Sequence, residues 1–90
     1  CQRIKPHIHL TPVMSSSMLN EMLRAKLYFK CENFQKVGAF KARGACNAVF
    51  SLSEEQARRG VVTHSSGNHG AALAWAARLR GIPATVVVPN

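Results

Sequence analysis

The sequence is poor in acidic side chains. Four Asp and Glu stand against 12 Lys and Arg in 90 residues, which gives a formal net charge of +8. Such a charge in a small domain suggests nucleic acid or another anionic surface as a partner. The cations are scattered, however, without a run of five or six and without interleaved aromatic residues. We therefore expect a solvated basic surface and no nucleic-acid partner.

Paired cysteines and long apolar runs are also lacking. Cys1, Cys31 and Cys46 are odd in number and show no C-x-x-C spacing, so neither a disulfide framework nor a zinc site is indicated. This usage is typical of a reducing compartment. No apolar stretch approaches the roughly 18 residues of a membrane span, and no signal-peptide core is present. We expect a soluble, cytoplasmic protein with no membrane partner.

The length and the two ends of the sequence indicate one incomplete unit. Ninety residues with 47% hydrophobic content can bury one small core. The sequence begins with Cys1 rather than Met and ends on the apolar run Val87–Asn90, which has the character of a strand. We interpret residues 1–90 as the N-terminal portion of a larger domain that continues beyond Asn90.

The first 40 residues predict one helix and one strand. The cluster Ser15–Ser17 offers an N-cap for a helix that runs to about Lys26, with Met18 and Met22 on its apolar face. Leu27–Glu32 alternates and contains aromatic residues, which favours a strand. A loop is expected over Asn33–Gly38.

Two helices are predicted in the middle of the chain. A helix of about 12 residues starts at Lys41, because apolar residues then recur at the i, i+3, i+4 and i+7 positions of one helical face. These residues are Ala42, Ala45, Cys46 and Val49. Ser53 and Gln56 match a capping box, so a short helix is expected over Glu54–Arg59, stopped by Gly60.

The last 30 residues predict a strand, a helix and a second strand. Gly60–His64 is expected to be a buried strand, followed by a turn over Ser65–Gly70. Gly81 and Pro83 end the next helix. Its apolar face contains Ala72, Trp75, Ala76 and Leu79. Ala84–Val88 is so continuously apolar that a buried strand is expected.

This order of elements defines the fold class. Strands that alternate with helices pair in parallel through crossover connections, and the helices cover the sheet. We predict an α/β fold with a partial parallel sheet in βαβαβ order.

Two segments place small and polar residues where a strand or loop turns into a helix, as at the ligand sites of open α/β sheets. In Lys36–Ala45, the lysine Lys41 sits at a predicted helix start, where the helix dipole and Arg43 disfavour its charged form. A neutral amine is what Schiff-base chemistry needs. Phe40 could cover the face of a planar cofactor. A plain surface lysine is the alternative interpretation.

The second segment, Ser65–Gly70, combines two hydroxyls and an amide side chain with backbone N–H groups at a helix N-terminus. Such a turn suits a carboxylate or phosphate, and ordinary helix capping by its serines is the alternative. His64 and His69 lack a third ligand, so no metal site is predicted.

Together the two segments resemble a known family. Gly38–Ala45 followed by Ser65–Gly70 is similar to the paired signature of fold type II pyridoxal-phosphate (PLP) enzymes, in the branch of serine/threonine dehydratases and serine racemases. Leu10–Val13 and Phe29–Lys36 match as well, so the resemblance runs from about Ile8 to Pro89. It implies the tryptophan synthase β-like fold, pyridoxal 5'-phosphate as cofactor, and residues 1–90 as an incomplete part of the catalytic domain.

The resemblance also implies roles for individual residues. Lys41 would hold the cofactor as a Schiff base and take the substrate Cα proton, with Phe40 near the pyridine ring. Asn68 would hydrogen-bond the phenolic oxygen of the cofactor. The substrate carboxylate would be surrounded by residues of the turn, namely Ser65, Ser66, Asn68 and His69. Because further cofactor contacts of the family lie beyond Asn90, we expect the 90 residues alone to be inactive.

Two reactions remain open on this resemblance. The leading hypothesis is dehydration of L-threonine or L-serine to a 2-oxo acid and ammonia, which needs one base, Lys41. The alternative is amino-acid racemisation, in which Ser66 is the acid/base on the opposite face; β-replacement is a further variant. The implied partners are a small amino-acid substrate and, in the full-length form, other copies of the chain. A small basic binding domain is the competing interpretation outside enzymology.

Overall fold

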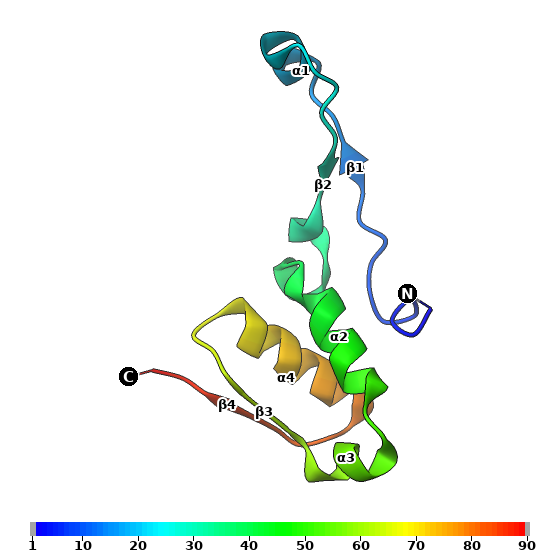
Figure 1. Ribbon diagram of the computed structural model, residues 1–90, viewed down its shortest axis with the longest axis vertical. Coiled ribbons are helices and arrows are strands. Elements are labelled where there is room, and N and C mark those ends of the chain that lie inside the picture. Colours follow the sequence, from blue (N-terminus) through cyan, green and yellow to red (C-terminus); the bar gives the residue numbers. More distant parts are fainter. Residues whose placement is uncertain (1, 90) are drawn as a thin grey trace.

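The computed structural model describes residues 2–89 and has an elongated shape of 53 × 36 × 15 Å. Figure 1 shows a helical body with a two-stranded sheet at one end and a long arm at the other. The arm contains β1 (Val13–Met14), α1 (Ser17–Leu23) and β2 (Phe29–Lys30). The 3-10 turns η1 (Glu32–Phe34) and η2 (Lys36–Gly38) lead into the body. The body contains α2 (Lys41–Ser51), α3 (Glu54–Arg59), β3 (Val61–His64), α4 (Asn68–Arg80) and β4 (Ala84–Val87).

The core lies between α2 and α4. The α2 residues that share a helical face are buried, as their spacing predicts, and they meet a buried face of α4. Most of these side chains are small, which lets the two helices approach closely. The core residues are Ile4, Ala45, Cys46, Val49, Ala72, Leu73 and Ala76.

The N-terminal segment, residues 2–12, packs along another side of α2. Ile4 is buried, and the ring of His7 stacks on Phe50 with centroids 4.3 Å apart. Arg3 donates a hydrogen bond to Asn47 Oδ1 at 3.0 Å. The segment before β1 is therefore part of the packed body, although the sequence gives it no regular periodicity.

The sheet of the body confirms the predicted class. β3 and β4 pair in parallel, in register from Val61 opposite Ala84 to His64 opposite Val87, and α4 connects them. This βαβ unit is the expected α/β arrangement, with a small parallel sheet. β2 pairs antiparallel with β1 instead, so the first strand of the predicted order lies outside the parallel sheet.

The prediction of buried strands is wrong for the described residues. Val62 is 71% exposed, and Val87 and Val88 are also exposed. In Figure 1 the helices α2 and α4 lie on one side of β3 and β4. Val61 and Val86 are less exposed than their neighbours, because alternate residues of a strand point to opposite faces. The expected strand character of Val87–Asn90 ends at Val87, and Asn90 itself lies outside the described residues.

The first helix is also shorter and more exposed than predicted. α1 ends at Leu23 instead of near Lys26, because Arg24 adopts the left-handed conformation with φ 49° and closes the last turn. Met18 and Met22, predicted as its apolar face, are 67% and 71% exposed. The helix stands at the end of the arm, away from the core (Figure 1).

The predicted helix ends in the body are confirmed. Ser53 and Gln56 form both hydrogen bonds of the capping box at the start of α3. Gly81 takes the left-handed conformation at the end of α4, with φ 76°. None of the helices within residues 2–89 is long and apolar enough to cross a membrane.

The close contact of α4 with the sheet depends on Gly70. A Cβ at this position would lie 2.9 Å from Val86 Cγ1 and 3.3 Å from Ser65 Cβ. Gly70→Ala is therefore expected to lower the free energy of unfolding of the complete protein by about 1–3 kcal/mol. The matched control is Gly44→Ala, since a Cβ there meets nothing within 4 Å and alanine favours a helix. Chemical denaturation measures both; equal stability of the two variants would contradict this account.

Candidate active site

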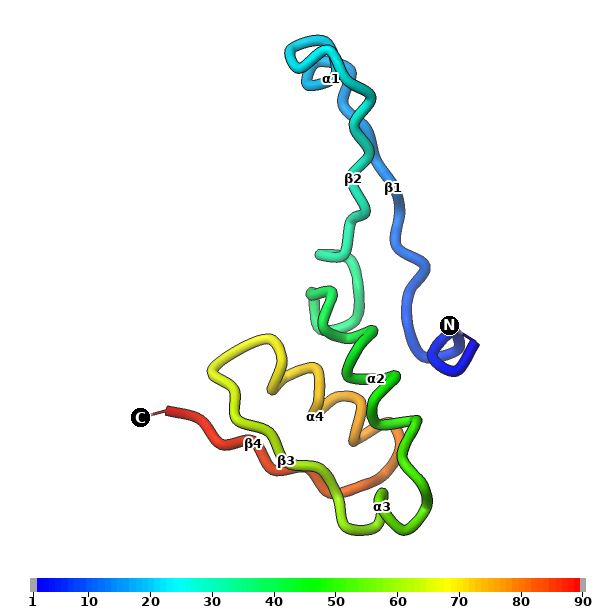
Figure 2. Tube along the Cα trace, in the orientation of Figure 1, coloured from blue at the N-terminus to red at the C-terminus, as the bar shows by residue number. Residues whose placement is uncertain are grey.

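The structure brings the two predicted motifs to the same end of the helix pair. Lys41 is the first residue of α2 and Asn68 is the first residue of α4. Figure 2 shows both helices starting on the side of the arm, and η2 contacts α4 directly. Because the helix N-termini point the same way, their dipoles both favour negative charge at this end.

Lys41 lies on an open side of α2. Lys41, Gly44 and Ala48 share this side and are exposed, whereas the other sides pack on α4 and on the N-terminal segment. Phe40 is 62% exposed, and Lys41 Nζ lies 5.3 Å from the centroid of its ring. An amine and an aromatic face are thus available side by side, with small neighbours further along the helix.

Arg43 is paired with an acidic side chain in the folded chain. Its guanidinium pairs with Glu32, with Nε donating to Oε2 at 2.8 Å and Nη2 donating to Oε1 at 3.0 Å. The guanidinium that stands two residues from Lys41 in the sequence is thus neutralised by an acidic partner. Sequence reasoning missed Glu32, since nothing in the spacing of positions 32 and 43 indicates a contact.

Ser65 organises the turn between β3 and α4. Its Oγ accepts hydrogen bonds from the backbone N–H of Gly67 at 3.2 Å and of Gly70 at 3.0 Å. Part of the capping alternative is therefore correct for this serine. Ser66, Asn68 and His69 are exposed on the same turn. Their side chains are therefore open to solvent at the start of α4.

The electrostatics near the site are set by Glu32. Hydrogen bonds from Arg43 and Thr11, together with the charges of Arg43 and Lys30, lower the pKa of this carboxyl from 4.5 to about 2. Glu32 in turn raises the pKa of Arg43. The Cys46 thiol is different, because burial in the core raises its pKa. The thiol is thus a neutral core group rather than a nucleophile.

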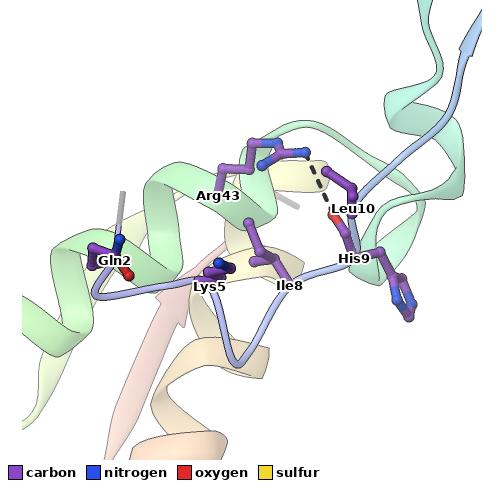
Figure 3. Close-up of a pocket in the computed structure, with 6 residues that line it drawn as sticks. All are labelled: Gln2, Lys5, Ile8, His9, Leu10 and Arg43. Carbon is purple, nitrogen blue, oxygen red and sulfur yellow. Dashed lines mark hydrogen bonds between the residues drawn. The ribbon is translucent and has the colours of Figure 1, made fainter.

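A separate hollow of about 500 Å³ lies on the other side of α2. It is lined by Gln2, Lys5, Ile8, His9, Leu10 and Arg43. Figure 3 shows Arg43 reaching from α2 toward the backbone of His9 across this hollow. Residues two apart on a helix point in nearly opposite directions, so the hollow does not share the side of Lys41.

A metal centre is not apparent in residues 2–89, where no three His, Cys, Asp or Glu side chains come together. His64 and His69 are both exposed, at the two ends of the Ser65–Gly70 turn. The two motifs themselves contribute amine, hydroxyl and amide groups.

Comparison with known proteins identifies the family. Residues 4–90 match the family of pyridoxal-phosphate dependent enzymes, and the chain belongs to it. Its cofactor is pyridoxal 5'-phosphate. The solved serine racemase of Dictyostelium discoideum superposes with a TM-score of 0.96 and 58% identity, over 99% of this chain and 29% of that one. The confirmed resemblance includes the fold type II class.

Two relatives of known activity are similar to nearly the whole of this chain. The chain is 66% identical over 88 residues to a serine racemase of Arabidopsis thaliana, covering 98% of this chain and 27% of that protein. It is 62% identical over 89 residues to a β-hydroxyaspartate dehydratase of Paracoccus denitrificans, covering 99% of this chain and 28% of that protein. The chain thus spans somewhat more than a quarter of the length of these relatives.

The side chains at the two helix starts fit this cofactor. A Schiff base needs an accessible primary amine, and Lys41 is exposed beside the exposed ring of Phe40. A planar ring with a phenolic oxygen suits an aromatic neighbour and an amide donor, and Asn68 is exposed at the start of α4. The roles of Phe40, Lys41, Ser65, Ser66, Asn68 and His69 stay predictions, but their placement is compatible with them.

Acid should weaken the site through Glu32. The lowered pKa of this carboxyl means that its contribution is complete above about 4.5 and is lost as the pH falls toward 2. By linkage this contribution is of the order of 3 kcal/mol at neutral pH. We expect the stability of the complete protein to fall across this window, and Glu32→Gln to flatten that part of the curve. A slope of stability against pH that is the same in wild type and Glu32→Gln between about pH 5 and pH 2, measured by denaturant titration, would contradict this expectation.

Proposed function

We propose that this chain is the N-terminal part of a longer PLP-dependent enzyme that removes and returns the Cα proton of small polar amino acids. We assign serine racemisation as its main reaction. One observation carries the proposal. An exposed amine, Lys41, lies on the first turn of α2, and an exposed hydroxyl, Ser66, lies on the turn just before α4. The similarity to serine racemases supports it.

The cofactor, when bound, supplies the conjugated ring that withdraws electrons from the substrate Cα. Lys41 holds the cofactor and moves a proton at its Nζ on one face of the substrate. Ser66 moves a proton at its Oγ on the other face. Two proton-transfer groups on opposite faces are what inversion at Cα requires.

The remaining residues of the turn bind and orient. The backbone at the start of α4, with Ser65, Asn68 and His69, holds the substrate carboxylate, because a helix N-terminus favours a negative charge. Phe40 would cover one face of the cofactor ring, and Asn68 would donate a hydrogen bond to the phenolic oxygen of the cofactor. Gly44 and Ala48 leave room beside Lys41.

β-Elimination is the second candidate reaction. The β-hydroxyaspartate dehydratase that is 62% identical favours a lyase activity on β-hydroxy amino acids. Removal of the Cα proton by Lys41 and departure of the β-hydroxyl as water would give an enamine. After its release the enamine tautomerises to an imine, and water hydrolyses the imine to the 2-oxo acid and ammonia. Dehydration of L-threonine or L-serine, the leading hypothesis from the sequence, is therefore retained here as the alternative to racemisation.

The role of Lys41 is tested by Lys41→Ala in the complete protein. The variant is expected to lose the visible absorbance of lysine-bound cofactor and all racemase and lyase activity, because no other amine can replace the covalent link. Lys36→Ala is the matched control, since it removes a lysine from η2. Borohydride reduction followed by peptide mapping locates the modified lysine. Label on a peptide that lacks Lys41 would overturn the assignment.

The role of Ser66 separates the two reactions. Ser66→Ala should slow interconversion of L- and D-serine by about 10² to 10⁴, the usual contribution of a proton-transfer group. Elimination from L-substrates should persist, since it needs one base. Ser53→Ala, which alters a serine of the α3 cap, is the control. Assays of both enantiomers and of the 2-oxo acid measure the outcome. If the wild-type enzyme catalyses elimination but no racemisation, then elimination is its main reaction and our assignment of racemisation is wrong.

A further inference from the structure

An ion pair holds the start of α2 on the side opposite Lys41. Arg43 lies two residues after Lys41, so their side chains point about 200° apart around the helix. Arg43 makes two parallel hydrogen bonds to the Glu32 carboxylate, at 2.8 and 3.0 Å. This geometry fixes the direction of the pair as well as its length. The ion pair therefore restrains the first turn of α2 without occupying the space around the Lys41 amine.

The ion pair is itself anchored to the N-terminal segment. Thr11 is 4% exposed, and its hydroxyl donates to Glu32 Oε1 at 2.5 Å. Lys30 Nζ donates to the Thr11 carbonyl oxygen at 2.6 Å. The carboxylate is thus bonded from two sides, and its lowered pKa agrees with a fully ionised, well-bonded group. The pair cannot shift unless the N-terminal segment shifts with it.

Gln35 makes a second attachment on the chain that enters Lys41. It is 4% exposed, and its side chain bonds both backbone groups of His9 at 2.8 Å, donating to the carbonyl oxygen and accepting from the N–H. Its Oε1 also accepts from the backbone N–H of Lys36 at 3.0 Å. The turn η2 before Lys41 is thereby tied to the same segment that Arg43 contacts.

We propose that Glu32, Arg43 and Gln35 are positioning residues that hold the backbone of Lys41, and so its amine, in the reactive place. The inference rests on the proposed function, in which Lys41 holds the cofactor. A lysine side chain has four flexible bonds, so its amine is only as well placed as the backbone from which it extends. Reaction rates are sensitive to displacements of about 1 Å at the reacting centre, which can cost about a hundredfold.

The test uses the complete protein with its cofactor. Glu32→Gln and Arg43→Met are expected to lower kcat per cofactor-loaded site about ten- to hundredfold, with a much smaller change in KM. The visible circular dichroism of the bound cofactor should change as well, because it reports the orientation of the ring. Arg43→Lys should lose less than Arg43→Met, since lysine keeps the charge but not the bidentate geometry.

Two comparisons separate positioning from general stability. The double variant Glu32→Gln with Arg43→Met should be about as slow as the slower single variant, because both remove one interaction. Glu55→Gln removes the exposed ion pair of Glu55 and Arg59 in α3, with the same change in charge, and should leave kcat and the dichroism unchanged. Glu32→Asp and Arg43→Lys provide the same readouts if the larger changes prevent folding.

The inference is overturned if Glu32→Gln or, failing that, Glu32→Asp keeps kcat per loaded site within about twofold of wild type while only Tm falls. The Glu32–Arg43 ion pair then contributes to the stability of the fold and not to the position of the Lys41 amine. Independent effects that multiply in the double variant overturn it as well. A wild-type protein whose cofactor is not on Lys41 instead overturns the proposed function, and the positioning role with it, so the two failures are distinguishable.

Discussion

The packing of α2 on α4 through small side chains is the contact on which the rest of the structure depends. Alanines at the interface let the helices lie close, and their parallel course brings both N-termini to one end. The sheet then follows from α4, whose first turn meets Val86 across Gly70. A larger side chain at the interface would separate the helix starts, and with them Lys41 from the turn at Ser65–Gly70.

The N-terminal segment holds α2 and the chain before Lys41 in place. It contacts α2 through apolar groups near Ile4 and His7, and it contacts the chain before Lys41 through polar groups at His9 and Thr11. The apolar part adds to the core, whereas the polar part fixes direction, because hydrogen bonds depend on angle as well as distance. One irregular stretch thus serves both the stability of the body and the geometry of the site.

Periodicity and caps made the helices of the body predictable. The apolar spacing in Lys41–Ser51, the capping box at Ser53 and the glycine at position 81 are local signals, and each was confirmed. The pairing of β2 with β1 and the contact of Glu32 with Arg43 depend on how distant segments meet, which no local pattern contains. The same limit explains the error at Met18 and Met22, since an apolar face indicates burial but not the surface that provides it.

The two site segments could be located from small and polar residues at predicted helix starts, whereas the roles of most of their residues came from the resemblance to a family. From the sequence alone, Arg43 is an uncompensated charge two residues from Lys41. In the folded chain the acid at position 32 compensates it. The placement of Lys41 at a helix start, by contrast, follows directly from the local pattern.

The one-sided covering of β3 and β4 has a consequence for synthesis on the ribosome. The contacts between α2 and α4 join segments about 30 residues apart, so the helical pair can form early in translation, at about 5–20 residues per second. The face that contains Val62 is then formed while still open to water. Such a surface attracts other nascent chains and chaperones. A folding intermediate made of these residues therefore carries an exposed apolar strand face, the kind of surface that promotes association.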